Sequence, residues 1–169
     1  MDLYLAPGAS GNVAWLDPWV AGIAADGRAV TLVPLPRGRA EAAVAAYRRT
    51  VLDLPESVIG GQSFGGRVAS LLAAESKPAG VLCLSYPLHA PGRHADWERR
   101  TAHWPRIDCP VLLLSGESDP FARIDLLRSA VRQLSQATLV TYPRIGHGLN
   151  PVRTAALSAI IEWMERLGG

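Results

Sequence analysis

Hydrophobic residues along the chain form six short, nearly continuous runs with turn-forming residues on either side. These runs predict β-strands over residues 3–6, 30–33, 57–60, 80–85, 111–114 and 137–141. A strand that is apolar throughout must be covered on both faces, which is typical of a parallel sheet between two layers of helices. The pattern therefore predicts an α/β protein built on about six parallel strands.

The stretches between these runs carry apolar residues at helical spacing. They predict helices over residues 13–25, 40–52, 64–74, 124–134 and 153–167. In the second of these stretches, Ala43, Val44, Tyr47 and Val51 share one face. Pro18 has to lie near the first turn of the first helix, because proline removes a backbone donor. Alternating strands and helices with right-handed crossovers predict a doubly wound, three-layer α/β arrangement.

One interval departs from this alternation. Residues 87–108 contain no clear strand. Loops of this length in a compact domain are usually lids or binding loops. We expect a long loop or a small lid that belongs to one domain spanning residues 1–169, with no separate cap domain.

Composition and charge narrow the possible classes of function. The 169 residues include 17 basic and 15 acidic side chains, a near balance that argues against a dedicated nucleic-acid binder. No stretch approaches the roughly 20 apolar residues that span a bilayer, and the N-terminus lacks the basic region of a secretion signal. Cys83 and Cys109 match no zinc-site spacing and predict buried thiols in a reducing compartment. We expect a cytoplasmic protein with no membrane partner, and the preference for arginine over lysine is typical of high-GC bacteria.

The strongest local motif is Gly61-Gln62-Ser63-Phe64-Gly65, which fits the pattern G-x-S-x-G. It directly follows one predicted strand and directly precedes a predicted helix, where a nucleophilic serine would be held on a tight, strained turn. Glycines are needed two residues on either side of Ser63, since side chains there would clash with the neighbouring strand and helix. The alternative is an ordinary glycine-rich turn with no catalytic role.

A serine hydroxyl needs a base to act as a nucleophile, and the chain has four histidines. His147 comes after the last predicted strand and before the closing helix, and we expect its flanking glycines to free the backbone so that the ring reaches the edge of the sheet. The other three, His89, His94 and His103, all fall within residues 87–108. There we expect solvated or packing roles.

The base needs a carboxylate to orient it. The fifth predicted strand leads into Glu117 and Asp119. Asp119 lies further past the strand end and is the expected acid, with Glu117 as the alternative. Ser63, Asp119 and His147 each follow a strand, in the Ser–Asp–His order of α/β-hydrolases. Ligands of open α/β sheets bind at this edge, where the strands have their carboxyl ends.

Two backbone N–H groups should stabilise the negative charge that develops when Ser63 attacks a carbonyl. Phe64, at the start of the predicted helix, is expected to supply one of them. Ala9, in the loop Pro7-Gly8-Ala9-Ser10-Gly11, is expected to supply the other, although this loop could equally be a plain glycine-rich turn. Such chemistry requires no metal ion and no organic cofactor.

Longer stretches of the chain carry a more specific signal than G-x-S-x-G. They are GQSFGGRVA at residues 61–69, LCLSYPLH at 82–89, PVLLLSGESDPF at 110–121 and Gly146-His147. In these stretches the chain resembles the small α/β-hydrolases of the dienelactone-hydrolase-like group. It looks most similar to predicted bacterial hydrolases whose animal relatives are a testis-expressed protein and a subunit of the NSL histone-acetylation complex. The resemblance implies a three-layer α/β-hydrolase fold with Ser63 as nucleophile, Asp119 as acid and His147 as base.

Two interpretations of the function follow. In the first, the protein is a serine hydrolase that cleaves a small-molecule ester, thioester or lactone through an acyl-enzyme. In the second, it keeps the fold as a binding module while catalysis is vestigial. The presence of Ser63, Asp119 and His147 favours the first. The sequence does not indicate an oligomeric state.

The interval between the fourth and fifth predicted strands also bears on the substrate. In one interpretation, Trp97 and Trp104 pin this interval to the body of the protein, and its arginines are solvated or paired with Asp96 and Glu98. In the other, the tryptophans wall a short acyl pocket and an arginine, Arg100, binds a substrate carboxylate through its planar fork. With no cap domain, the pocket should be shallow and favour short acyl esters.

Overall fold

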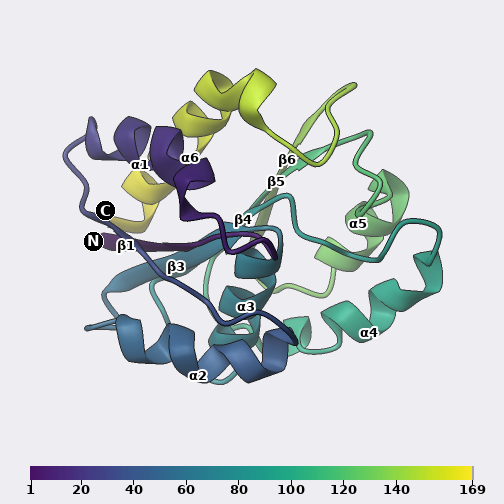
Figure 1. Cartoon of the computed structure of the whole chain (residues 1–169), viewed down its shortest axis with the longest axis horizontal. Helices are drawn as coiled ribbons and strands as arrows, with labels where there is room; N and C mark the ends of the chain where they lie inside the picture. The colour runs from purple at the N-terminus through teal and green to yellow at the C-terminus, as the bar shows by residue number, and fades with distance from the viewer. Residues whose placement is uncertain (169) are drawn as a thin grey trace.

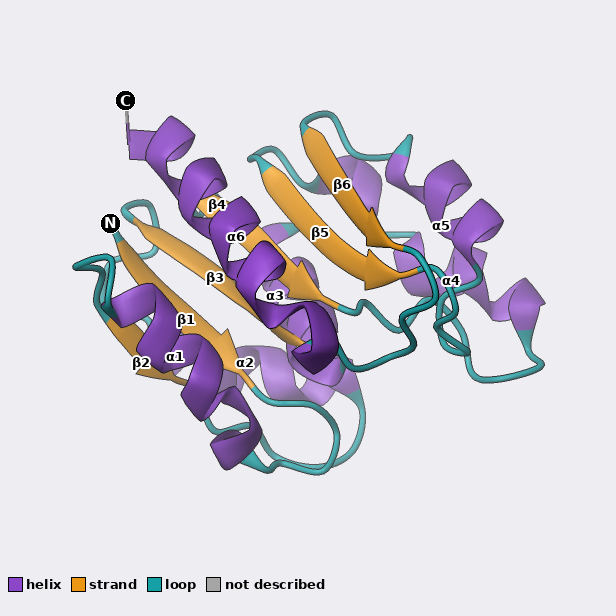
Figure 2. Ribbon diagram, turned by 90° about the horizontal axis from the view of Figure 1, so that it is seen from above, coloured by secondary structure: helices purple, strands orange, loops and turns teal. Residues whose placement is uncertain are grey.

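A computed structural model describes residues 1–168 and contains one sheet of six parallel strands. In Figure 2 the arrowheads of β1, β4, β5 and β6 point toward the same edge of the sheet. The strand order is β2-β1-β3-β4-β5-β6. The bounds are β1 Asp2–Ala6, β2 Val30–Leu32, β3 Ser57–Gln62, β4 Gly80–Leu84, β5 Val111–Gly116 and β6 Ala137–Tyr142. The predicted parallel sheet is confirmed, with every strand within two residues of its expected position.

Helices cover both faces of this sheet, so the fold has three layers (Figure 1). Helices α1 and α6 lie on one face, and the remaining helices lie on the other. Their bounds are α1 Asp17–Ala24, α2 Ala40–Thr50, α3 Phe64–Ala73, α4 Trp97–Thr101, α5 Ile124–Val131 and α6 Arg153–Gly168. Together with the parallel sheet, this arrangement confirms the predicted three-layer α/β fold.

Side chains of each strand point alternately to the two faces, which divides the core into two clusters. Leu3 and Leu5 of β1 pack with helices α1 and α6, whereas Tyr4 and Ala6 pack with α2 and α3. The same alternation holds in β4 and β5. Strands β4 and β5 are buried on both faces, and this is the physical reason that their apolar runs predicted a covered parallel sheet.

Three predicted helices differ from the structure at their ends, and one of them is α5, which ends at Val131 rather than at residue 134. The stretch from Val13 begins as a 3₁₀ helix over Val13–Leu16, and α1 follows with Pro18 in its first turn, as expected. Helix α2 ends at Thr50 rather than at residue 52, and Leu52 is 90% exposed. Apolar spacing alone extended this helix too far, because Leu52 is an apolar residue that lies outside the core.

Residues 87–108 are more ordered than the predicted long loop. They contain the five-residue helix α4 and two 3₁₀ helices, His94–Asp96 and Trp104–Arg106. A helix of fewer than two turns shows no periodicity in the sequence, so the pattern could not reveal it. Within residues 1–168, no helix has both the length and the hydropathy needed to cross a membrane.

Candidate active site

The candidate site lies where the order of the strands reverses. Strand β1 pairs with β2 on one side and with β3 on the other, so the loops that leave β1 and β3 turn to opposite faces of the sheet. Ligand sites of open α/β sheets form in the crevice at such a point. Ala9 is in the loop after β1, and Ser63 follows β3 directly.

Ser63 occupies a strained backbone conformation between β3 and α3. Its φ is 49° and its ψ is −109°, a combination that residues with side chains rarely adopt. Its N–H donates a 2.8 Å hydrogen bond to the carbonyl of Leu84, which anchors the turn to the end of β4. Strain of this kind is typical of functional sites, and the turn leaves the hydroxyl of Ser63 in contact with His147, as described below.

The glycines around Ser63 are required by close backbone packing, as the sequence predicted. A Cβ atom on Gly61 would meet the carbonyl oxygen of Ala6 and would lie 2.7 Å from the carbonyl carbon of Gly65. A Cβ atom on Gly65 would itself meet that Ala6 oxygen. Side chains at these positions would force β1, β3 and α3 apart and would displace the serine.

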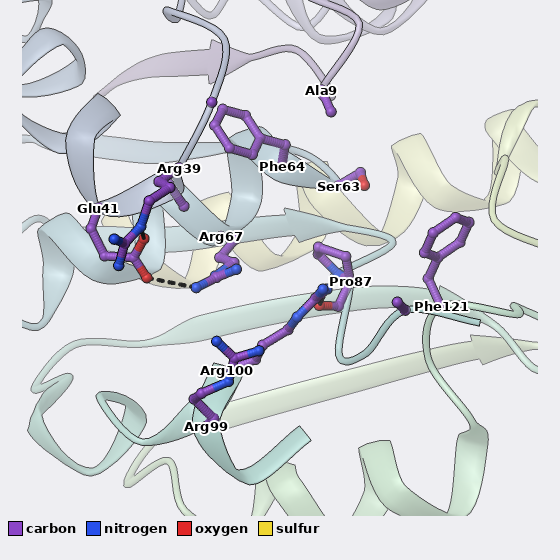
Figure 3. A pocket seen from close by; sticks show the side chains of 13 residues that line it. Ala9, Arg39, Glu41, Ser63, Phe64, Arg67, Pro87, Arg99, Arg100 and Phe121 are labelled. Atoms are coloured by element: carbon purple, nitrogen blue, oxygen red, sulfur yellow. Dashed lines mark hydrogen bonds and ion pairs between the residues drawn. The ribbon is translucent and has the colours of Figure 1, made fainter. Parts of the chain in front are cut away.

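Ser63, His147 and Asp119 form one continuous chain of hydrogen bonds. The Oγ of Ser63 is 2.9 Å from Nε2 of His147, and Nδ1 of His147 is 2.8 Å from Oδ2 of Asp119. Since a carboxylate only accepts hydrogen bonds, Nδ1 carries the proton and Nε2 is left free to accept from the serine. Figure 3 shows Ser63 facing the cavity described below.

Asp119 is held in place by a second contact. Its side chain is fully buried, and its Oδ1 accepts a 2.8 Å hydrogen bond from the N–H of Phe121. The ring of Phe121 packs against the imidazole of His147, with ring centres 4.6 Å apart. Both oxygens of the carboxylate therefore have a fixed partner, and the imidazole is packed from the side.

The alternative acid, Glu117, lies elsewhere. Its Oε1 accepts hydrogen bonds from Thr141 at 2.8 Å and from Arg128 at 3.1 Å, which hold it beside β6 and α5. The structure therefore brings Asp119, and not Glu117, to His147.

The other three histidines are held away from Ser63. Nε2 of His89 accepts from the N–H of Arg123 at 3.0 Å, so its Nδ1–H donates to the carbonyl of Ala90. His94 packs edge-on against His89. Buried His103 contacts the hydroxyl of Ser70 at 2.8 Å, and burial lowers its pKa to about 4. The packing role expected for these side chains is confirmed for His89 and His103.

The expectation about the glycines beside His147 is wrong. Gly146 and Gly148 both have ordinary backbone angles, and a Cβ atom at either position would meet nothing within 4 Å. The left-handed residue of this loop is Arg144, with a φ of 60°. The turn at Arg144, rather than glycine flexibility, accompanies the placement of the histidine.

The backbone N–H groups of Ala9 and Phe64 are the two donors that the sequence predicts for the oxyanion. Phe64 is the first residue of α3, and helix N-termini leave such groups without an intrahelical partner. Among the described residues, neither Phe64 N–H nor Ala9 N–H donates an intramolecular hydrogen bond. Ala9, Ser63 and Phe64 all line the same cavity.

A cavity of about 450 Å³ opens beside Ser63 (Figure 3). Its lining is mixed, with Phe64, Pro87 and Phe121 as apolar walls. The charged residues that line it are Arg39, Glu41, Arg67, Arg99 and Arg100. Arginines therefore dominate the charge of this cavity.

Arg100 lines the cavity as predicted, but Trp97 and Trp104 do not. Trp104 is 1% exposed and packs edge-on against Tyr86, with ring centres 5.0 Å apart. Trp97 is partly buried against the same core cluster. The expectation that tryptophans wall an acyl pocket is therefore wrong. These large apolar surfaces instead anchor residues 87–108 to the body, the alternative that the sequence left open.

Sequence analysis did not single out Arg39, Glu41 or Arg67. A signal existed for Arg67, because it lies four residues after Ser63 at the start of one helix, and i,i+4 neighbours share a face. Arg39 and Glu41 come from the start of α2, and no local pattern relates them to the motif. Only the packing of α2 beside α3 brings them to the cavity.

No group of three or more metal-ligating side chains comes together in the part of the chain that the structure describes. The side chains at the site offer one hydroxyl, one imidazole and one carboxylate, linked in series. That set is suited to nucleophilic attack assisted by a general base.

Comparison with known proteins gives one family and several structures. A family model described as "Alpha/beta hydrolase domain" matches residues 35–165. A monoacylglycerol lipase from Paleococcus ferrophilus has a TM-score of 0.83 at 16% identity, and the match covers 98% of this chain and 94% of that one. A thermophilic esterase from Thermogutta terrifontis has a TM-score of 0.76 at 16% identity, with 99% and 90% covered. Est1E from Butyrivibrio proteoclasticus has a TM-score of 0.77 at 15% identity, with 98% and 87% covered. At these identities the structures share the fold.

Proposed function

The chain belongs to the alpha/beta hydrolase domain family, and we propose that it is a serine hydrolase that cleaves small esters, thioesters or lactones. The observation that carries this proposal is the unbroken chain of hydrogen bonds from Ser63 through His147 to Asp119, at a strained turn beside a cavity. Within the family, we infer from residues 61–69 and 82–89 that its nearest group is the dienelactone-hydrolase-like one.

In the proposed first step, the Oγ of Ser63 attacks the carbonyl carbon of the substrate while Nε2 of His147 takes the hydroxyl proton. Asp119 accepts from Nδ1–H throughout, which fixes the tautomer and stabilises the imidazolium that forms. The carbonyl oxygen becomes an oxyanion next to the N–H groups of Ala9 and Phe64. The N-terminus of α3 adds its positive dipole end.

The tetrahedral intermediate then collapses to an acyl-enzyme. His147 returns its proton to the oxygen of the departing alcohol, or to the sulfur of the departing thiol. The bond between this atom and the carbonyl carbon then breaks. A water molecule repeats the sequence: His147 takes its proton, the water oxygen attacks the ester carbon, and Ser63 leaves with the proton restored. A lactone follows the same course, with both products joined in one hydroxy acid.

Esterases and lipases among the structures of the same fold support acyl transfer as the reaction class. The size of the cavity, about 450 Å³, is within the usual range for small-molecule sites. Both features agree with a small ester as substrate.

Hydrolysis of 4-nitrophenyl acetate by the wild type and by Ser63→Ala tests this proposal. We expect the substitution to abolish activity and to leave the fold intact. Ser70→Ala is a matched control, because it also removes a hydroxyl 2.8 Å from a histidine nitrogen, but at a buried position away from the cavity. Full activity in Ser63→Ala, or an inactive wild type, would contradict the proposal. An inactive wild type would favour the binding-module interpretation.

A further inference from the structure

The cavity beside Ser63 carries an excess of positive charge. Four arginines line it, Arg39, Arg67, Arg99 and Arg100, against one acidic residue, Glu41. They come from three separate elements, α2 with its N-cap, α3 and α4. In Figure 3 the arginines and Glu41 gather on one side, whereas Ser63 and Phe121 lie on the other. The cavity is therefore polarised, with the nucleophile at one end and cations at the other.

The arginines that line the cavity outnumber the carboxylates that pair with them. Glu41 pairs with Arg67 at 2.7 Å and more distantly with Arg39 at 3.8 Å. Arg99 reaches Asp96 at 3.6 Å. One carboxylate thus serves two of the cavity's arginines, and a third arginine depends on a residue outside the lining.

Arg100 stands out among the four. None of the ion pairs within residues 1–168 involves it, and its Nη1 donates to the carbonyl of Pro87 at 2.9 Å. Burial, and then the neighbouring charge of Arg67, lower the pKa of Arg100. The Nε atoms of Arg67 and Arg100 are both enclosed, and neither has a hydrogen-bond partner in the described part of the chain. Buried donors are normally satisfied, so the set of acceptors around these two guanidinium groups is incomplete, and both residues line the cavity.

We propose that the substrate of this site carries an anionic group, such as a carboxylate, that binds to Arg67 and Arg100 while its ester carbonyl lies at Ser63. This inference rests on the proposed hydrolase function and names the substrate class for it. Guanidinium groups bind carboxylates through paired hydrogen bonds, and charge-assisted bonds of this kind are stronger than neutral ones. The positive field would also raise the rate at which anionic substrates arrive.

Two pairs of substrates, each matched in size, test the charge preference. The first pair is mono-(4-nitrophenyl) adipate and its methyl ester, which place the charge on the acyl side. The second is 4-acetoxybenzoate and its methyl ester, which place it on the alcohol side. We expect the wild type to favour the anionic member of at least one pair by about tenfold or more in kcat/KM, after subtraction of the uncatalysed rate.

Substitutions of the arginines and of Glu41 should change the anionic-to-neutral ratio of kcat/KM in opposite directions. Arg100→Gln and Arg67→Gln should each lower the anionic-to-neutral ratio by about tenfold. Glu41→Gln removes the competing carboxylate and should raise the ratio. Arg93→Gln is the control, since Arg93 is 70% exposed, pairs with Asp96 and does not line the cavity, so its ratio should match the wild type. If an Arg67 or Arg100 variant fails to fold, Glu41→Gln and Arg99→Gln, both at exposed side chains, still give the test.

The outcomes separate this inference from the proposed function. Activity on the neutral esters with no preference for the anionic member of either pair would overturn the inference and leave the hydrolase standing. A preference that none of the arginine or Glu41 variants changes would also overturn it. If neither anionic nor neutral esters are hydrolysed, the proposed function itself fails. A preference that falls with the arginine variants and rises with Glu41→Gln is the expected result.

Discussion

The two oxygens of the Asp119 carboxylate have separate partners, the imidazole of His147 and the backbone N–H of Phe121. Asp119→Asn would keep the shape of this side chain but could present an N–H to Nδ1, which favours the wrong tautomer of His147. We expect a loss of about 10⁴-fold in kcat, the effect of the same change in serine-protease triads. Glu117→Gln should change little, because Glu117 binds Thr141 and Arg128 instead. Steady-state kinetics on a 4-nitrophenyl ester would show this, and the reverse pattern would assign the acid to Glu117.

His103 is expected to make the stability of the protein depend on pH. Burial, with a smaller effect of the charge on Arg67, lowers its pKa in the folded protein to about 4, against about 6.5 when unfolded. Between these values the unfolded chain binds the proton more strongly, so stability falls as the pH drops from about 6.5 toward 4. At pH 5 the difference corresponds to about 2 kcal/mol in the free energy of unfolding.

His103→Gln tests this contribution, since glutamine can still donate to the hydroxyl of Ser70. Urea unfolding of the wild type and the variant at pH 7 and pH 5 gives the four values needed. The wild type should lose more stability between the two pH values than the variant does. Equal losses would show that His103 is not the titrating group.

At the scale of the elements, the turn between β3 and α3 depends on how closely β1, β3 and α3 approach. Gly65→Ala would place a methyl group against the carbonyl oxygen of Ala6, which is backbone and cannot rotate away. We expect about 3 kcal/mol of destabilisation, the upper range for overpacking, together with loss of activity as the serine shifts. Gly148→Ala, where a Cβ atom meets nothing within 4 Å, should leave the stability nearly unchanged. Denaturant unfolding of both variants measures this difference. A Gly65→Ala variant as stable as Gly148→Ala would contradict the prediction.

The elements that the sequence predicted are those with a regular pattern of apolar residues that pack into the core. All six strands and the five longer helices were found, because apolar runs and helical spacing reflect the two core clusters directly. Helix α4 was missed because five residues hold no periodicity. The C-terminal end of α2 was predicted two residues too late, because Leu52 is apolar yet exposed.

The candidate site was predicted unevenly for a similar reason. Ser63, Asp119 and His147 follow parallel strands, so their presence at one edge of the sheet could be inferred from chain order alone. The arginines of the cavity come from elements on separate segments, and no local spacing connects Arg39 with Arg100. The sequence allowed two roles for Trp97 and Trp104. A tryptophan that packs against the core and one that packs against a ligand cannot be distinguished from the sequence pattern.

At the scale of the whole molecule, one layered fold encloses a cavity of about 450 Å³ between the loops at the sheet edge and helices α2 and α3. Five charged residues line this cavity, so a long acyl chain would lie against charged groups and gain little apolar contact. We expect kcat/KM for 4-nitrophenyl esters of two to twelve carbons to be highest among the short members. A maximum at eight carbons or beyond would show that the site accommodates lipid chains.

We propose that Ser63 becomes a covalent nucleophile because His147 and Asp119 activate it. Labelling with a fluorophosphonate probe, followed by mass spectrometry of the intact protein and its peptides, measures this directly. We expect a single adduct on Ser63 in the wild type and none in Ser63→Ala, with labelling retained in Ser70→Ala. An unlabelled wild type, or an adduct that persists in Ser63→Ala, would contradict it.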